Sequence, residues 1–187
     1  VYKRQVYATV IRDWLGGDDH DVLGATHERL DLVDEPAPGA FPPASSRFTD
    51  VPDGQWYSDA IAWMAATGIT TGTSPTTFSP HDPLTRGQTA AFLHRFRGEP
   101  TGAPPAGFED VERGRYYAVP IDWMASTGIT TGTSPTRFSP GDPLTRAHLA
   151  TFLWRMEGRP ARPAAAFTDV ERPSYYASAV DWMAADG

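Results

Sequence analysis

A 24-residue segment of this chain occurs twice. It reads WMAATGITTGTSPTTFSPHDPLTR over residues 63–86 and WMASTGITTGTSPTRFSPGDPLTR over residues 123–146, with 21 of the 24 positions identical. A third copy begins at Phe167 and stops at Gly187, before the repeated loop. Such a fixed period predicts a fold in which one structural unit stacks on itself. It also indicates that function belongs to a surface that recurs in each repeat, rather than to one catalytic pocket.

The composition argues against several classes of protein. Acidic residues outnumber basic ones 23 to 16, the net charge is −7, and there is no dense basic stripe, so no nucleic-acid partner is expected. No apolar run approaches the length of a membrane span. The absence of cysteine excludes disulfides and thiolate metal sites, and is compatible with export. Arginine accounts for all basic residues except Lys3, which indicates a GC-rich genome.

The first 47 residues divide into three parts. Residues 1–5, VYKRQ, are what the transposon end of a sequencing-library adapter encodes, and we exclude them from the fold. Residues 6–33 have helically spaced apolar positions but too few to bury a core, so they are expected to be the remnant of a larger domain. Residues 34–47, rich in Pro, Ala and Ser, are expected to form a semi-extended linker. The alternative for the linker is a packed segment held by Phe41.

The segment before the linker has a family resemblance of its own. Its residues YATVIRDWLGGDDHDVLGATHERLDLV resemble the C-terminal end of the DUF1501 family, exported bacterial proteins related to alkaline phosphatases and sulfatases. The resemblance implies that metal-site and catalytic residues would lie upstream of this chain. We therefore expect no enzymatic activity from the residues present.

Each repeat is expected to be a helix, a long loop and a second helix. The repeats cover residues 48–107, 108–166 and 167–187. Pro120, which a helix tolerates only in its first turn, places the start of the first helix of repeat 2 near residue 119. Gly68 is positioned as the left-handed residue that ends the first helix of repeat 1. The predicted fold class is therefore all-α.

The second helix of each repeat has a clear start signal. Thr85 and Gln88 form a capping box, in which the threonine accepts a hydrogen bond from the third helical amide and the glutamine reaches back. Thr145 and His148 make a poorer box in repeat 2. In the loop before this helix, Phe78 is expected to attach the loop to the core.

These residues together resemble a known family. The segment FTDVPDGQWYSDAIAWMAATGITTGTSPTTFSPHDPLTRGQTAAFLHRF resembles an S-layer homology domain in its FxDV opening, its GI-x-x-G turn, its F-x-P-x-x-x-L-T-R approach and the helix that follows. The resemblance covers residues 48–187 and implies three repeats in a pseudo-threefold spindle, incomplete here because the third copy is cut. It also implies that grooves between repeats bind cell-wall polysaccharide, which in well-studied members carries ketal-linked pyruvate.

Two arginines are the first candidates for binding such a polymer. Arg86 and Arg146 are expected in the first turn of a helix, where unpaired amides and the helix dipole favour an anion. An arginine fork adds two directed donors to a carboxylate. The alternative is a solvated helix start. The usual family motif is Thr-Arg-Ala-Glu, whereas this chain has TRGQ and TRAH. The loss of the acidic residue leaves the arginine freer for an anion.

The FxDV aspartates and the aromatic residues that follow are further candidates. Asp50 and Asp110 either orient the arginine and accept sugar hydroxyls, or form an Asx turn or N-cap before the first helix, which is the interpretation we favour. Trp56 and Tyr116 either pack on the face of a sugar ring or belong to the core. The repeated tryptophans Trp63, Trp123 and Trp182 fit core or inter-repeat contacts better.

The repeated loop supplies the last candidates. Gly72 with Thr73, and Gly132 with Thr133, offer amides and hydroxyls at close approach, although part of this loop must simply turn the chain. The histidines lack the spacing of a metal site, and there is no phosphate-binding loop or activated nucleophile, so no metal or cofactor is expected.

The residues and the resemblance together predict a function. We expect a non-catalytic module that attaches an exported protein to the bacterial cell wall by binding an anionic secondary polysaccharide. The alternatives are a protein–protein or self-assembly module of a surface layer, and the non-catalytic tail of an exported phosphatase- or sulfatase-like enzyme. The sequence does not determine the oligomeric state.

Overall fold

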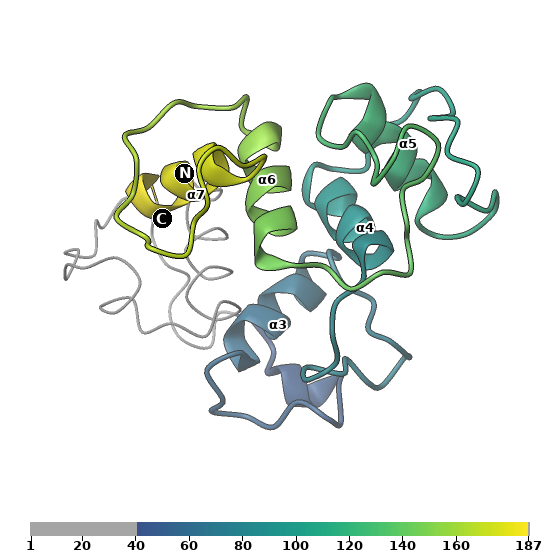
Figure 1. Cartoon of the computed structure of the whole chain (residues 1–187). Helices are drawn as coiled ribbons and strands as arrows, with labels where there is room; N and C mark the ends of the chain where they lie inside the picture. The colour runs from purple at the N-terminus through teal and green to yellow at the C-terminus, as the bar shows by residue number, and fades with distance from the viewer. Residues whose placement is uncertain (1–40, 187) are drawn as a thin grey trace. The chain divides into compact units, whose positions relative to one another are not determined.

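The computed structural model describes residues 41–186. The expectations for residues 1–5, residues 6–33 and the start of the linker lie outside the described residues. The helices are a 3-10 turn η1 (Ala44–Ser46), α3 (Ser58–Ala66), α4 (Arg86–Phe96), α5 (Ala118–Ser126), α6 (Arg146–Met156) and α7 (Ala177–Asp186) (Figure 1). Between residues 41 and 186 there is no β-strand, only isolated bridges such as Ser74 to Thr77. An all-α fold is therefore confirmed for this part of the chain, whereas the pseudo-threefold arrangement stays a prediction.

The described chain falls into two compact units whose boundary does not follow the sequence repeats. The first holds residues up to His81 together with the end of α7 from Trp182, and the second holds residues 82–181. Repeat 1 is thus divided, because its second helix, α4, belongs to the same unit as α5 and α6 of repeat 2.

The first unit is built around the opening of repeat 1. Phe48 and Val51 are fully buried and form a core with Ile61 of α3. Phe78 packs against this core, as expected, and its ring lies 5.7 Å from that of Phe48. Gly68 ends α3 with a φ of +75°, which confirms its predicted left-handed conformation.

The end of the expected linker packs against the first repeat instead of extending into solvent. Ala44, in η1, is buried in the core of the first unit, and Phe41 packs against that core. The amide of Phe48 donates to the carbonyl of Ala44, which fixes the turn onto the repeat. The alternative interpretation, a packed segment held by Phe41, therefore describes residues 41–47.

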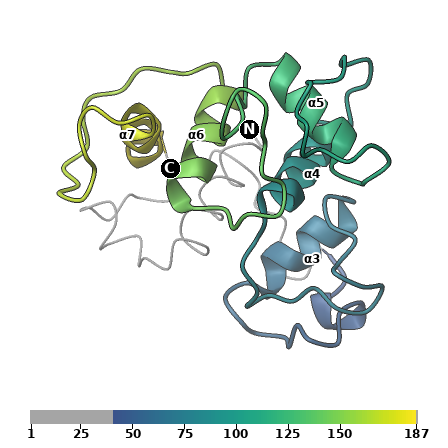
Figure 2. The same ribbon diagram turned by 45° about the vertical axis from the view of Figure 1, so that its right-hand side comes forward.

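The second unit packs α4 of repeat 1 on α5 of repeat 2, and both views show the two helices side by side (Figure 2). Ile121 and Met124 of α5 are fully buried. Pro120 is the third residue of α5, so the helix begins one residue before the expected start, still with proline in the first turn. Trp123 is buried and its ring lies 5.5 Å from His94 of α4, which confirms its predicted packing role.

Buried aspartates hold the segments between repeats. The Asp122 carboxylate on α5 accepts a hydrogen bond from the amide of Ala106 at 2.8 Å and pairs with Arg113. Asp181 on α7 makes the same contacts with Ala165 and Arg172. In both repeats the arginine precedes the aspartate by nine residues, and this spacing is the signal by which the sequence encodes the contact.

No helix among residues 41–186 combines the length and the apolar character needed to cross a membrane.

Candidate functional site

Arg86 lies at the first position of α4, as predicted, but its side chain is only 2% exposed. Its Nε donates to the carbonyl oxygen of Phe138 at 2.8 Å. The guanidinium carbon lies 4.7 Å from the ring centre of Phe138 and 5.5 Å from that of Phe152. The residues around Arg86, which belongs to repeat 1, thus come mostly from repeat 2. Local sequence patterns cannot reveal such a contact between repeats.

Arg86 carries its positive charge in a poorly solvated place, and the net effect of its surroundings is to lower its pKa. Burial lowers the pKa of Arg86, while the charges of Asp142, Tyr175 and Asp110 act in the opposite direction. Arginine stays protonated in proteins at any physiological pH. Arg86 is therefore a weakly hydrated cation, and its charge also acts on Tyr175 of repeat 3.

One part of the predicted anion site is wrong. We expected unpaired amides at the start of α4, but the amide of Arg86 donates to the carbonyl of Asp142 at 3.0 Å, and that of Gly87 to the carbonyl of Pro140 at 2.9 Å. The amide of Gln88 donates to the Thr85 hydroxyl at 3.2 Å, within a complete capping box. These donors are already satisfied, so an anion near α4 would have to use side chains.

Arg146 occupies the same position on α6 but has different surroundings. Its side chain is exposed, and Thr145 before it accepts from the amide of His148, which forms half of the predicted box. The two arginines that the repeat makes equivalent are therefore unlike in solvation. A ligand role for Arg146 stays a prediction.

His148 and Tyr175 complete a cluster with Arg86. The two rings are stacked with centres 5.8 Å apart, and His148 Nδ1 lies 3.0 Å from the Thr145 hydroxyl. Burial, and then the charge of Arg86, lower the pKa of His148, so the ring is neutral at pH 7. We name the group of Arg86, Phe138, Thr145, His148, Phe152 and Tyr175 the Arg86 cluster.

The FxDV aspartates fix the repeated loop. Both Asp50 oxygens accept from backbone amides of Phe78 and Ser79, and Asp110 accepts from those of Phe138 and Ser139, at 2.7–3.1 Å. Burial raises the pKa of each carboxyl, but these hydrogen bonds, joined at Asp110 by the charge of Arg137, outweigh burial and the net pKa of both is lowered. The favoured interpretation, an Asx turn or N-cap before the first helix, is wrong, because the amides that these carboxylates accept from lie 28 and 29 residues away in the repeated loop.

This loop contact also connects an aspartate to the arginine. Asp110 holds the amide of Phe138, and the carbonyl of the same residue accepts from Arg86 Nε. Asp110 therefore positions the acceptor that orients Arg86, and its charge also helps to keep the guanidinium protonated.

The repeated aromatic position is on the surface. Trp56 is 62% exposed, Tyr116 56% and Tyr175 54%. Each stands against the next residue in an edge-on contact with ring centres 5.1–5.2 Å apart, which limits its motion. Exposed, oriented aromatic rings are suited to packing on sugar rings, and the alternative core role does not apply to them.

The glycine–threonine loops are largely self-contained. Gly72 has a φ of +84°, and a Cβ there would lie 2.5 Å from the carbonyl oxygens of Ser74 and Thr77. The amide of Thr73 donates to the carbonyl of Thr77 at 2.8 Å, and its hydroxyl contacts the Ser79 hydroxyl at 3.0 Å. Gly132 and Thr133 repeat this arrangement with Arg137 and Ser139. The turn-forming interpretation accounts for these contacts, and a ligand role stays a prediction.

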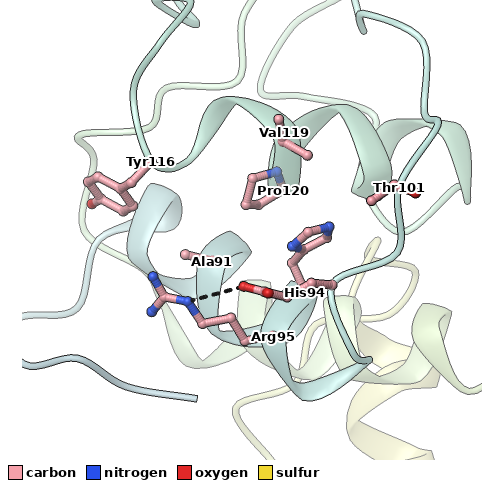
Figure 3. Close-up of a pocket in the computed structure, with 8 residues that line it drawn as sticks. Ala91, His94, Arg95, Thr101, Tyr116, Val119 and Pro120 are labelled. Atoms are coloured by element: carbon pink, nitrogen blue, oxygen red, sulfur yellow. Dashed lines mark ion pairs between the residues drawn. The ribbon is translucent and has the colours of Figure 1, made fainter. Parts of the chain in front are cut away.

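A pocket of about 310 Å³ lies between α4 and α5 and includes residues that the sequence patterns did not indicate. Figure 3 shows Tyr116 at one end and Thr101 at the other, with α4 side chains facing Val119 and Pro120. Arg95 pairs with Glu99 at 3.9 Å, and a dashed line marks this ion pair in Figure 3. We name this set the α4–α5 pocket; it comprises Ala91, His94, Arg95, Glu99, Thr101, Tyr116, Val119 and Pro120.

Within residues 41–186 no group of His, Cys, Asp or Glu side chains is arranged to hold a metal ion.

Comparisons with known proteins agree with the repeat pattern. The family model of the S-layer homology domain matches residues 47–90 and 107–150. The chain is 29% identical over 144 residues to a "Cell surface protein" of Thermoanaerobacter kivui, covering 74% of this chain and 18% of that protein. It is 32% identical over 123 residues to an "Endoglucanase" of Bacillus sp. (strain KSM-635), covering 66% and 12%. An "S-layer protein" of Bacillus thuringiensis subsp. finitimus is 28% identical over 134 residues, covering 68% and 16%.

These matches cover only a small part of each relative. The chain spans less than a fifth of the length of each of these relatives. S-layer homology domains generally anchor proteins to the cell surface and are themselves non-catalytic. Residues 47–90 and 107–150 therefore each match the S-layer homology domain, which supports two such repeats in this chain.

Proposed function

We propose that this chain anchors an exported protein to the bacterial cell wall by binding an anionic secondary cell-wall polysaccharide. The observation that supports it best is the Arg86 cluster, in which a buried cation lies beside an exposed aromatic ring. A charge with little water around it attracts an anion more strongly than a solvated one does. An aromatic ring beside it can pack on the sugar that carries the anionic group.

The chemistry of the cluster is suited to binding and not to turnover. His148 is neutral at pH 7 and has the Thr145 hydroxyl at hydrogen-bond distance, while Tyr175 has a pKa raised mainly by burial. The Thr145 hydroxyl also accepts from the amide of His148 at the start of α6, and the rings are fixed by packing. The proposal therefore assigns the surface a non-covalent role.

A wall-binding assay with matched variants tests the cluster. Arg86→Gln removes the charge and should weaken sedimentation with purified cell walls by about two- to fivefold, the size expected when one charge near a bound anion is lost. Arg146→Gln changes the equivalent exposed arginine and is expected to have the smaller effect. Circular dichroism checks that both variants remain helical.

A second variant avoids the buried position. Tyr175→Ala alters a ring that is 54% exposed, so folding should be unaffected while wall binding falls by about threefold to tenfold. If Tyr175→Ala and a folded Arg86→Gln both bind walls like the parent, the Arg86 cluster is not the binding site. The self-assembly alternative predicts instead that sedimentation depends on protein concentration and not on walls.

A further inference from the structure

Three hydrogen bonds meet at the hydroxyl of Thr145, the residue that caps the start of α6. The amide of His148 donates to this hydroxyl at 3.2 Å, and Nδ1 of the same histidine lies 3.0 Å from it. The hydroxyl of Tyr175, from repeat 3, makes the third contact. A hydroxyl has one hydrogen and two acceptor positions, so these three partners use its full capacity. The direction of each hydrogen bond therefore depends on the other two.

His148 is the member of this group whose charge changes near neutral pH. Its ring stacks on that of Tyr175, with centres 5.8 Å apart and planes inclined by 30°, so α6 and the start of repeat 3 hold it in place. Burial, and then the charge of Arg86 on α4, lower the pKa of His148 from its ordinary 6.5. The carboxylates of Asp142 and Asp110 act in turn on Arg86. The ring is therefore neutral at pH 7 and takes up a proton in acidic solution.

A neutral His148 ring allows one complete set of hydrogen bonds. Nδ1 can accept, so the Thr145 hydroxyl donates its one hydrogen to Nδ1. The two acceptor positions of that hydroxyl then take the amide of His148 and the hydroxyl of Tyr175. In this set the Tyr175 hydrogen is held against Thr145.

A protonated His148 ring requires a different set. Both ring nitrogens then carry hydrogens, so Nδ1 can only donate. Nδ1 and the amide of His148 fill both acceptor positions of Thr145, whose own hydrogen turns to the oxygen of Tyr175. The Tyr175 hydrogen is thereby released, and because this side chain is 54% exposed, the hydrogen is available to a ligand on the surface.

We propose that His148 is a pH switch that reverses the hydrogen bond between Thr145 and Tyr175. In neutral solution the Tyr175 hydroxyl donates to Thr145, and in acidic solution it accepts from Thr145 and donates outward. An outward donor and an added positive charge on His148 both favour an anionic group. Wall binding should therefore strengthen as the pH falls, a consequence that rests on the proposed function.

Repeat 1 contains the same group without a histidine. Tyr116 makes a side-chain hydrogen bond with Thr85, whose hydroxyl accepts from the amide of Gln88 at 3.2 Å. The Gln88 side chain accepts from the amide of Thr85 at 2.8 Å, and an amide side chain does not titrate. His148→Gln therefore gives repeat 2 the arrangement that repeat 1 already has, and Tyr116 is the internal control for Tyr175.

NMR measures the switch without any ligand. Tyrosine labelled with carbon-13 at Cζ reports the hydrogen bonding of the phenol, and the ring C–H signals of His148 report its protonation. Between about pH 7.5 and about pH 5, the Tyr175 signal should shift together with those of His148, while the Tyr116 signal changes little. His148→Gln should abolish the Tyr175 shift.

Thr145→Val separates the hydrogen bond from the charge. This variant keeps the shape of the side chain and leaves His148 to titrate, but it removes the hydroxyl that connects the two rings. The Tyr175 signal should then lose most of its shift. An undiminished shift in folded Thr145→Val would mean that the histidine charge acts through space, and the switch would be refuted.

Wall sedimentation over the same pH range tests the consequence for binding. The parent should bind walls about two- to fivefold more strongly at the lower pH, and His148→Gln should show less of this increase. A Tyr175 signal that does not follow His148 refutes the switch, whatever the walls show. If the signal follows but wall binding is equal at both pH values, the switch has no role in binding. If the parent binds no walls at either pH, the proposed function itself fails.

Discussion

Residues at equivalent positions of two repeats can have different surroundings. Arg86 and Arg146 occupy the same position of the same motif, yet Arg86 is enclosed by Phe138 and Phe152 and Arg146 is exposed. The motif predicted the position of both at a helix start. It could not predict the enclosure, since the hydrogen bond that fixes Arg86 joins residues 52 apart.

Gly72 is the residue whose replacement should be least tolerated in the repeated loop. Gly72→Ala would set a Cβ 2.5 Å from two carbonyl oxygens at a positive φ, so we expect a loss of at least about 2 kcal/mol in the free energy of unfolding, measured in urea. Gly98→Ala is the matched control, because its φ is also positive but no atom lies within 4 Å of the added Cβ. Equal losses for both variants would mean that the close contacts contribute nothing.

His148 should make stability depend on pH. Because its folded pKa is lowered from the ordinary 6.5, the unfolded chain binds the proton first as pH falls. The free energy of unfolding should therefore decrease as pH falls below about 6.5. His148→Gln, which introduces the residue found at the equivalent Gln88, should reduce this decrease. Urea unfolding at pH 7 and pH 5 provides the comparison, and an identical decrease in both proteins would exclude His148 as its source.

At the scale of helices and loops, local signals predicted much of the fold. Pro120 placed the start of α5 to within one residue, and the box of Thr85 and Gln88 placed the start of α4. Contacts between distant segments were not predictable in this way. The aspartates were expected to act locally, but they hold loop amides 28 and 29 residues away, because the loop returns across the FxDV turn in the folded chain.

Asp122 should be important for holding the segment before repeat 2 onto α5. Asp122→Ala would leave the amide of Ala106 and the side chain of Arg113 without their shared acceptor, so we expect a loss of about 2 kcal/mol in a denaturant titration. Arg113 is half exposed and can regain water, so Arg113→Ala should cost less than about 1 kcal/mol. A larger loss for Arg113→Ala than for Asp122→Ala would show that the ion pair, and not the amide contact, holds the segment.

At the scale of the whole molecule, the repeat period predicted the helix–loop–helix architecture better than it predicted the residues of the candidate site. The helix–loop–helix units follow from fixed spacing, capping and proline, and two of them match the S-layer homology domain. The α4–α5 pocket was not predicted beyond Tyr116, because its other residues come from the end of one repeat and the start of the next. A surface shared by two repeats has no continuous sequence pattern by which to recognise it.

If this chain binds cell walls through their anionic polysaccharide, its binding must depend on that polymer. Sedimentation of the chain with purified cell walls, before and after chemical removal of the secondary polymer, measures this dependence. We predict that most of the protein sediments with intact walls, and that this fraction falls to the wall-free background after removal. Undiminished binding to the stripped walls would show that the chain does not bind through this polysaccharide.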